Sequence, residues 1–186
     1  MRSRNCWSPA SRLTAALRNA LLFLAAISLS VAASAQADAL QPAAADDIAG
    51  AVTDCWNAVG AKDVNRGSLQ VAGWKAAHSD AQDKSVAKPL TLYGRAGRQS
   101  LIMVAERASQ PMCSVIARVA SPQDLGETAG TIQKALVALD PQVKATRDGN
   151  TLVFLALPKL AMADPTGSKE KPGLRIVVGY QDSEKK

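Results

Sequence analysis

The clearest indication of fold class in this chain is the stretch Gln142-Val-Lys-Ala-Thr-Arg-Asp-Gly-Asn-Thr-Leu-Val-Phe-Leu-Ala-Leu157. Two runs of strand-forming residues, 142–147 and 151–157, flank Asp148-Gly149-Asn150, an arrangement that is typical of a tight β-hairpin. So short a connection joins antiparallel strands, because parallel neighbours need a crossover of about a dozen residues. The last third is therefore predicted to be antiparallel β structure, with a final strand over 174–180.

Earlier segments predict further strands. Runs 89–93 and 99–106 flank Gly94-Arg-Ala-Gly97, whose glycines permit the positive φ of a tight turn and indicate a second hairpin. Residues 112–119 alternate between apolar and polar side chains, as a strand with one buried face does. The segment 68–74 begins with the same alternation, and we expect it to be extended as well.

Two segments have the spacing of amphipathic helices. In 45–60, apolar residues recur with helical spacing behind Asp46 and Asp47, whose negative charges suit the positive end of a helix dipole. A second helix is expected between Ser121, a favourable capping residue followed by proline, and Asp140, which precedes another proline.

The order helix, strands, helix, strands predicts an α+β domain. We expect two amphipathic helices packed on one face of a mainly antiparallel sheet of about five to seven strands. Gly126 and Gly130 make the second helix thin, which predicts a close crossing with a neighbouring element. A single domain is expected over 44–180, between a flexible leader, 36–43, and a disordered tail, 181–186.

Several predicted strands are apolar on both faces, although a sheet covered by helices on one face is free to be polar on the other. In 99–105, for example, Leu101 and Met103 lie opposite two more apolar side chains. The second face therefore needs a cover. The candidates are the segments 158–172 and 61–88, a second copy of the chain, a partner protein or an apolar small molecule. The candidate binding surface consists of Leu101, Met103, Leu152, Phe154 and Trp74, although Trp74 also fits a core position.

The first 35 residues match the three-part pattern of a secretory signal peptide. Four arginines lead into the apolar run 20–27, and small residues at Ala33 and Ala35 suit a cleavage site before Gln36. The apolar run is shorter than the roughly 20 residues that span a bilayer. We therefore expect a cleaved Sec signal over 1–35, a periplasmic or secreted bacterial protein, and no integral membrane protein after cleavage.

The charge balance argues against nucleic-acid binding. The chain has 22 basic and 16 acidic residues, but four of the basic residues and none of the acidic ones lie in 1–35. Residues 36–186 therefore carry 18 basic and 16 acidic residues, a net charge of +2, with only five aromatic side chains. Nucleic-acid proteins depend on dense positive charge and on aromatic stacking platforms, and this chain offers neither.

Cys55 and Cys113 form an even pair in the expected mature chain, which in an oxidising compartment predicts a disulfide. Cys55 falls on the apolar stripe of the first helix and Cys113 on the apolar side of a strand, so the bond would join helix to sheet. Closing so long a loop stabilises a fold by roughly 4 kcal/mol on the chain-entropy view. The spacing is not that of a redox Cys-x-x-Cys pair.

Catalytic chemistry has little support in the sequence. His78 is the only histidine, which excludes a multi-histidine metal site, and no nucleophile-elbow, Walker or dinucleotide-binding pattern occurs. Arg95 and Arg98 flank a turn and offer a small anion site as one alternative to simple surface charge. The acidic residues have structural explanations at helix starts and turns. No cofactor and no metal are expected.

These observations favour a small exported protein that acts by binding an envelope protein or a second copy of itself, without catalysis. One alternative is a carrier that holds an apolar small molecule on the second face. A less favoured alternative is a hydrolase with a carboxylate pair assembled in space.

Overall fold

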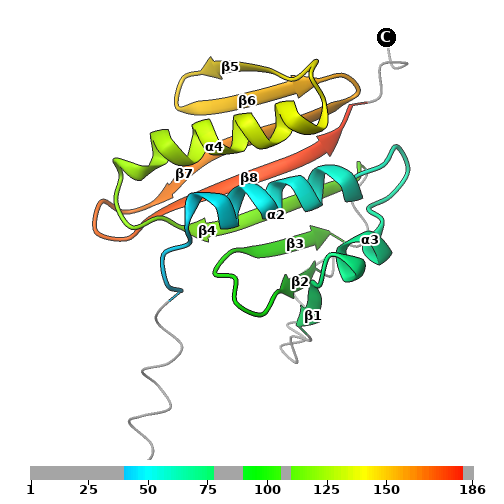
Figure 1. The fold of residues 1–186 in the computed structure, drawn as a ribbon, viewed down its shortest axis with the longest axis horizontal. Coiled ribbons are helices and arrows are strands. Elements are labelled where there is room, and N and C mark those ends of the chain that lie inside the picture. The colour runs from blue at the N-terminus through cyan, green and yellow to red at the C-terminus, as the bar shows by residue number, and fades with distance from the viewer. Residues whose placement is uncertain (1–39, 78–89, 106–109, 182–186) are drawn as a thin grey trace, which may run out of the picture. The chain divides into compact units, whose positions relative to one another are not determined.

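One antiparallel sheet of eight strands forms the centre of the fold (Figure 1). The structure is a computed structural model that describes residues 40–77, 90–105 and 110–181. The predicted signal peptide, residues 36–39 of the predicted leader, His78 and the tail from 182 lie outside the described residues. Within them the α+β class is confirmed, although the sheet has more strands than the expected five to seven.

The elements follow one another in a simple order. They are α2 (Ala45–Ala58), α3 (Arg66–Val71), β1 (Lys75–Ala77), β2 (Leu90–Gly94), β3 (Leu101–Ala105), β4 (Met112–Arg118), α4 (Asp124–Leu139), β5 (Lys144–Asp148), β6 (Thr151–Ala156), β7 (Lys159–Gly167) and β8 (Pro172–Tyr180). The strands are arranged β1-β2-β3-β4-β8-β7-β6-β5, with every neighbouring pair antiparallel. Both predicted hairpins, β2–β3 and β5–β6, are present.

The two halves of the described domain share one topology. The N-terminal half, α2 to β4, and the C-terminal half, α4 to β8, each contain a helix followed by a four-strand antiparallel meander, with α3 added in the first. β4 and β8, the last strands of the two meanders, pair at the centre of the sheet. The strand order is therefore mirrored about the β4–β8 seam. No sequence motif indicates this repeat of a helix and a four-strand meander.

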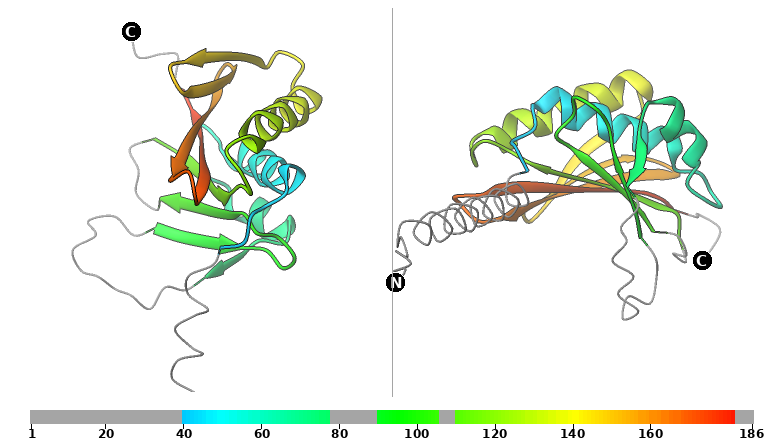
Figure 2. Two further views of the ribbon diagram at one scale, coloured as in Figure 1. Left: turned by 90° about the vertical axis from the view of Figure 1, so that its left-hand side faces the viewer. Right: turned by 90° about the horizontal axis from the view of Figure 1, so that it is seen from below.

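Helices α2 and α4 lie side by side on one face of the sheet (Figures 1 and 2), as predicted. The core fills the space between these helices and the sheet. Its largest fully buried side chains include Ile48 and Val52 from α2, Ile132 and Leu136 from α4, and Phe154 from β6. The helices end near the predicted positions, at Ala58 and Leu139.

The expectation of an extended segment over 68–74 is wrong. Residues Arg66–Val71 form the short helix α3, and the extended structure begins only at Lys75. Asn65 caps this helix, because its Oδ1 accepts a hydrogen bond of 3.1 Å from the Ser68 amide. A local cap thus outweighs the two-residue alternation that suggested a strand.

The segment 158–172 does not cover the second face. Most of it is β7, which lies within the sheet between β6 and β8. In sequence, the three prolines and two alanines of this segment obscure the strand signal. Pro165 is nevertheless accommodated in β7, where it is the register partner of Leu174.

Helix α4 does pack closely against α2, but the contact does not lie at the two glycines of α4, where the sequence predicts it. A Cβ atom placed on Gly126 or on Gly130 would meet no heavy atom within 4 Å, leaving aside the adjoining residues and the backbone of α4 itself. These glycines therefore lower the intrinsic stability of α4, although a Cβ would fit at both positions.

Candidate functional site

The second face is the side of the sheet turned away from α2 and α4, and none of the described helices lies over it (Figure 2). Alternation along the strands places every other side chain there. One row across the sheet consists of Leu92, Met103, Ser114, Val177, Met162 and Val153. A second row consists of Met112, Gly179, Leu160 and Leu155.

These two rows expose large apolar side chains to solvent. Met112 and Met162 are each 38% exposed, and Leu155 is 37% exposed. On the helix-covered face, by contrast, Ile176 and Val178 of the same central strands are fully buried. A contiguous apolar surface of this kind is typical of an interaction site.

A hollow of about 250 Å³ opens in the second face above Gly179. Gly179 stands between Met112 on β4 and Leu160 on β7 in the sheet register, and it lacks the side chain that would fill the space between them. Met162, Val177 and Tyr180 also line the hollow, together with Gln181 and with Gln110 and Pro111 just before β4. The hollow is therefore a gap in one row, with mostly apolar walls.

One end of the second face is polar. Arg175 on β8 and Asp164 on β7 are register partners and form an ion pair, with 3.5 Å between Nη2 and Oδ2. The hydroxyl of Thr151 on β6 donates a hydrogen bond to Asp164. Charges of both signs thus mark this end, whereas the end around Gly179 is apolar.

The predicted binding residues do not share one face. Leu101 and Met103 lie on the second face, whereas Leu152 and Phe154 point toward the helices, where Phe154 is fully buried. Trp74 is also buried, and its Nε1 donates a hydrogen bond of 2.8 Å to Asp54 Oδ2. Alternation within one strand correctly sorts its side chains onto two faces. It does not show which of these faces lies on the same side of the sheet as a given face of another strand.

Leu160 and Met162 belong to the segment 158–172, which was expected as a candidate cover of the second face, and no sequence signal indicated Met112, Val177 or Gly179. The structure makes all five part of the second face. The signal for β7 was the alternation in Lys159-Leu-Ala-Met-Ala163, where large and small side chains take turns.

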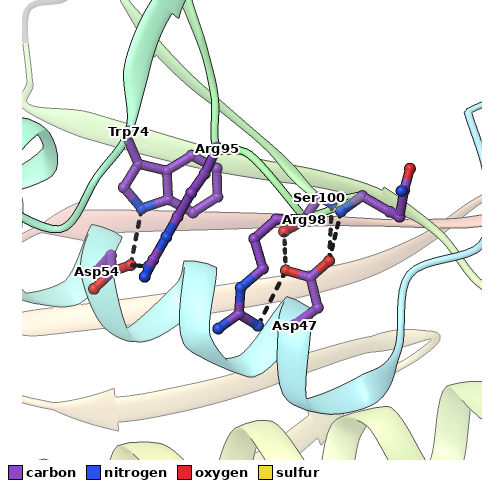
Figure 3. Close-up of polar contacts among 7 residues, drawn as sticks. Asp47, Asp54, Trp74, Arg95, Arg98 and Ser100 are labelled. Carbon is purple, nitrogen blue, oxygen red and sulfur yellow. Dashed lines mark hydrogen bonds and ion pairs between the residues drawn. The ribbon is translucent and has the colours of Figure 1, made fainter.

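Arg95 and Arg98 engage carboxylates of α2 (Figure 3). Arg95 lies 3.6 Å from Asp54, and Arg98 lies 3.5 Å from Asp47. Asp47 is buried and also accepts hydrogen bonds from the amides of Gln99 and Ser100 and from the Ser100 hydroxyl, at 2.7, 3.3 and 2.8 Å. These arginines hold the β2–β3 turn against α2, which explains their charge without a bound anion.

The predicted disulfide between Cys55 and Cys113 is present. Both residues are fully buried, and their Cα atoms lie 5.6 Å apart. The bond joins α2 to β4 on the helix-covered face, opposite the apolar rows. It is thus a structural link, since neither sulfur is exposed to a reaction partner.

Lys159 makes the polar contact between β7 and the end of α2. Its Nζ donates a hydrogen bond of 2.7 Å to the carbonyl oxygen of Trp56, in the last turn of the helix. Burial lowers the pKa of the Lys159 ammonium from its ordinary value of 10.5. Within the described ranges, no three His, Cys, Asp or Glu side chains gather in a way that would hold a metal ion.

Comparisons with protein-family models, with curated proteins and with solved structures found no match for this chain. In the part of the chain that the structure describes, no helix combines the length and the apolar character needed to cross a membrane.

Proposed function

We propose that this protein is a small exported, disulfide-stapled protein of the bacterial periplasm or cell exterior that acts by binding through its second face. The observation that carries the proposal is the pair of apolar rows centred on Met112, Met162 and Val177, over which none of the described helices lies. Such a surface gains free energy when a partner removes it from water.

The size of the hollow favours a protein partner over a small-molecule cargo. Ligand pockets usually enclose about 300–1,000 Å³, whereas the hollow above Gly179 offers about 250 Å³ and lies on a sheet surface. That volume suits one apolar side chain inserted as an anchor. The surrounding methionines suit such a contact, because their unbranched side chains adapt to a partner's shape.

Export is the second part of the proposal. Residues 1–35 have the composition of a Sec signal, and a buried disulfide is typical of proteins in oxidising compartments. Mass spectrometry of protein produced with its own N-terminal segment tests this part. We expect the mass of residues 36–186 less two hydrogens, and a full-length mass in the exported fraction would contradict cleavage.

Site-specific photo-crosslinking in the periplasm of a producing bacterium tests binding. A benzophenone amino acid replaces Met162 on the second face, and a matched variant carries it at Val137 on α4, which has nearly the same exposure, 37%. We expect one adduct of defined mass from position 162 and none from position 137. No adduct at 162, or the same adducts at both positions, would refute binding through the second face.

A further inference from the structure

We propose that the partner of the second face is a second copy of this chain, with the two sheets packed face to face. The twofold axis runs parallel to the strands, along the seam between β4 and β8. This inference rests on the proposed function and names the occupant of the same surface. Three observations on the second face lead to it: the matching of side-chain sizes, the position of the charges and the available area.

The mirrored strand order fixes what such an axis brings together. Rotation about a line between β4 and β8 places β4 opposite the second copy's β8, and β3 opposite the second copy's β7. Residues of one row then face residues of the same row. The N-terminal half of each chain thereby contacts the C-terminal half of the other, and the two sets of contacts are reciprocal, as in any isologous interface.

Side-chain sizes match under this rotation. Met112 and Gly179 are register partners on either side of the seam, so Met112 of one copy lies opposite the hollow above Gly179 of the other. In the next row, Ser114 lies opposite Val177, again a small residue against a larger one. Large side chains that alternate with small ones across facing sheets interdigitate without voids.

The charges select the direction of the axis. With the axis along the strands, the polar ends that contain Arg175 and Asp164 lie at the same end of the assembly, and apolar rows face apolar rows. An axis across the strands would place this ion pair against the apolar end near Gly179. That arrangement would remove the charges from water without new partners, which is costly.

The area fits a reversible dimer. Six strands about 4.8 Å apart, each contributing about 20 Å of length, give roughly 600 Å² per copy. The total of about 1,200 Å² lies at the lower limit for specific, stable interfaces. We therefore expect a dimer that dissociates on dilution and not an obligate one.

Thiol cross-linking between two variants, each with one added cysteine beside the intact Cys55–Cys113 disulfide, tests the arrangement. Met103→Cys lies on β3 and Met162→Cys on β7, which the rotation brings opposite each other across about 10 Å between stacked sheets. Two copies of the same variant would place their thiols about three strand spacings apart, roughly 14 Å laterally. A bis-maleimide of matching short span should therefore link an equimolar mixture of the two variants and neither variant alone.

A mixture that yields a covalent dimer, with at most traces from each variant alone, supports the proposal. Equal cross-linking of the single variants, or none in the mixture at concentrations where sedimentation shows a dimer, overturns it. A chain that sediments as a monomer at every concentration also overturns it. If photo-crosslinking at Met162 still gives one adduct with a different protein, binding through the second face stands and only the second copy is excluded.

Gly179→Met supplies an independent measurement, because the new side chain fills the hollow of each copy. The space above Gly179 is open, since a Cβ there would approach no closer than 4.0 Å to Pro111. We expect at least a tenfold weaker dimer with an unchanged circular dichroism spectrum. Met112→Ala in the same chain should restore association by emptying the opposing position, whereas an unaltered dimer in Gly179→Met would contradict the proposed contact.

Discussion

The two halves of this domain have the same order of elements but are held together by different interactions. In the N-terminal half, α2 is bound to its strands by the Cys55–Cys113 disulfide and by the buried carboxylate of Asp47. In the C-terminal half, α4 contributes buried side chains such as Ile132 and Leu136, and it contains two glycines at which an added Cβ would meet open space.

This difference teaches that one topology can be stabilised in two ways. Covalent and ionic links make the N-terminal half sensitive to reduction and to the loss of single polar groups. The C-terminal half depends on apolar burial and on the helix propensity of α4, each the sum of many small contributions.

Reduction of the disulfide should have the largest effect, and it should fall on the N-terminal half. Cys55 and Cys113 are 58 residues apart in sequence, and opening a loop of that length costs about 4 kcal/mol of stability on the chain-entropy view. Urea unfolding of the oxidised and reduced protein measures the loss. After reduction, amide hydrogen exchange should become faster in α2 and β4 than in β6. An equal increase in exchange rate in both halves would contradict the view that the disulfide stabilises the N-terminal half in particular.

Asp47→Asn should produce the next largest effect. The amide keeps the size of the side chain but turns one of the two acceptor oxygens into an N–H donor, which then faces either the Gln99 and Ser100 amides or the Ser100 hydroxyl and Arg98. It also removes the negative charge that pairs with Arg98. We expect a loss of about 2 kcal/mol in the free energy of unfolding. Asp46→Asn is the matched control, because Asp46 adjoins it on α2 but is exposed. Equal losses in the two variants would show that only helix-dipole charge matters.

Gly126→Ala and Gly130→Ala should strengthen the C-terminal half. Each removes the entropic cost of glycine in a helix, and no heavy atom outside α4 obstructs the new methyl group. We expect roughly 1 kcal/mol of added stability from each, measured as a higher unfolding midpoint. Gly173→Ala is the contrasting variant, because its Cβ would lie 2.8 Å from the Thr166 hydroxyl. A decrease with Gly126→Ala would reveal a packing contact at α4.

The features that sequence predicted correctly depend on local signals. The hairpin around Gly149 follows from a turn residue whose φ of 58° suits glycine, and the stripe that carries Cys55 identifies one face of α2. The pairing of Cys55 with Cys113 was predictable because only two cysteines follow the expected signal. Each of these inferences uses residues close in sequence or a very small number of alternatives.

The features that sequence missed depend on tertiary placement. Phe154 and Met103 were assigned to one face, yet Phe154 lies under the helices and Met103 on the second face. Strand alternation alone does not fix which side the helices cover. Gly179 carried no signal either, because the hollow above it exists only where Met112 and Leu160 become its neighbours across two strands.

A substitution of Lys159 should give the smallest effect, and it tests the polar contact between β7 and the end of α2. Its pKa is lowered by burial, so in the window just below 10.5 the unfolded chain binds more protons than the folded one. Stability attributable to Lys159 therefore rises as pH increases through that window and is lost as pH falls through the lowered pKa. Urea unfolding of the wild type and of Lys159→Met at pH 7 and pH 10 measures this effect. Between pH 7 and pH 10, the free energy of unfolding should rise more in the wild type than in the variant, by less than about 1 kcal/mol because the side chain is only partly buried. A constant difference between the two proteins would mean that the contact with Trp56 contributes through packing and not through charge.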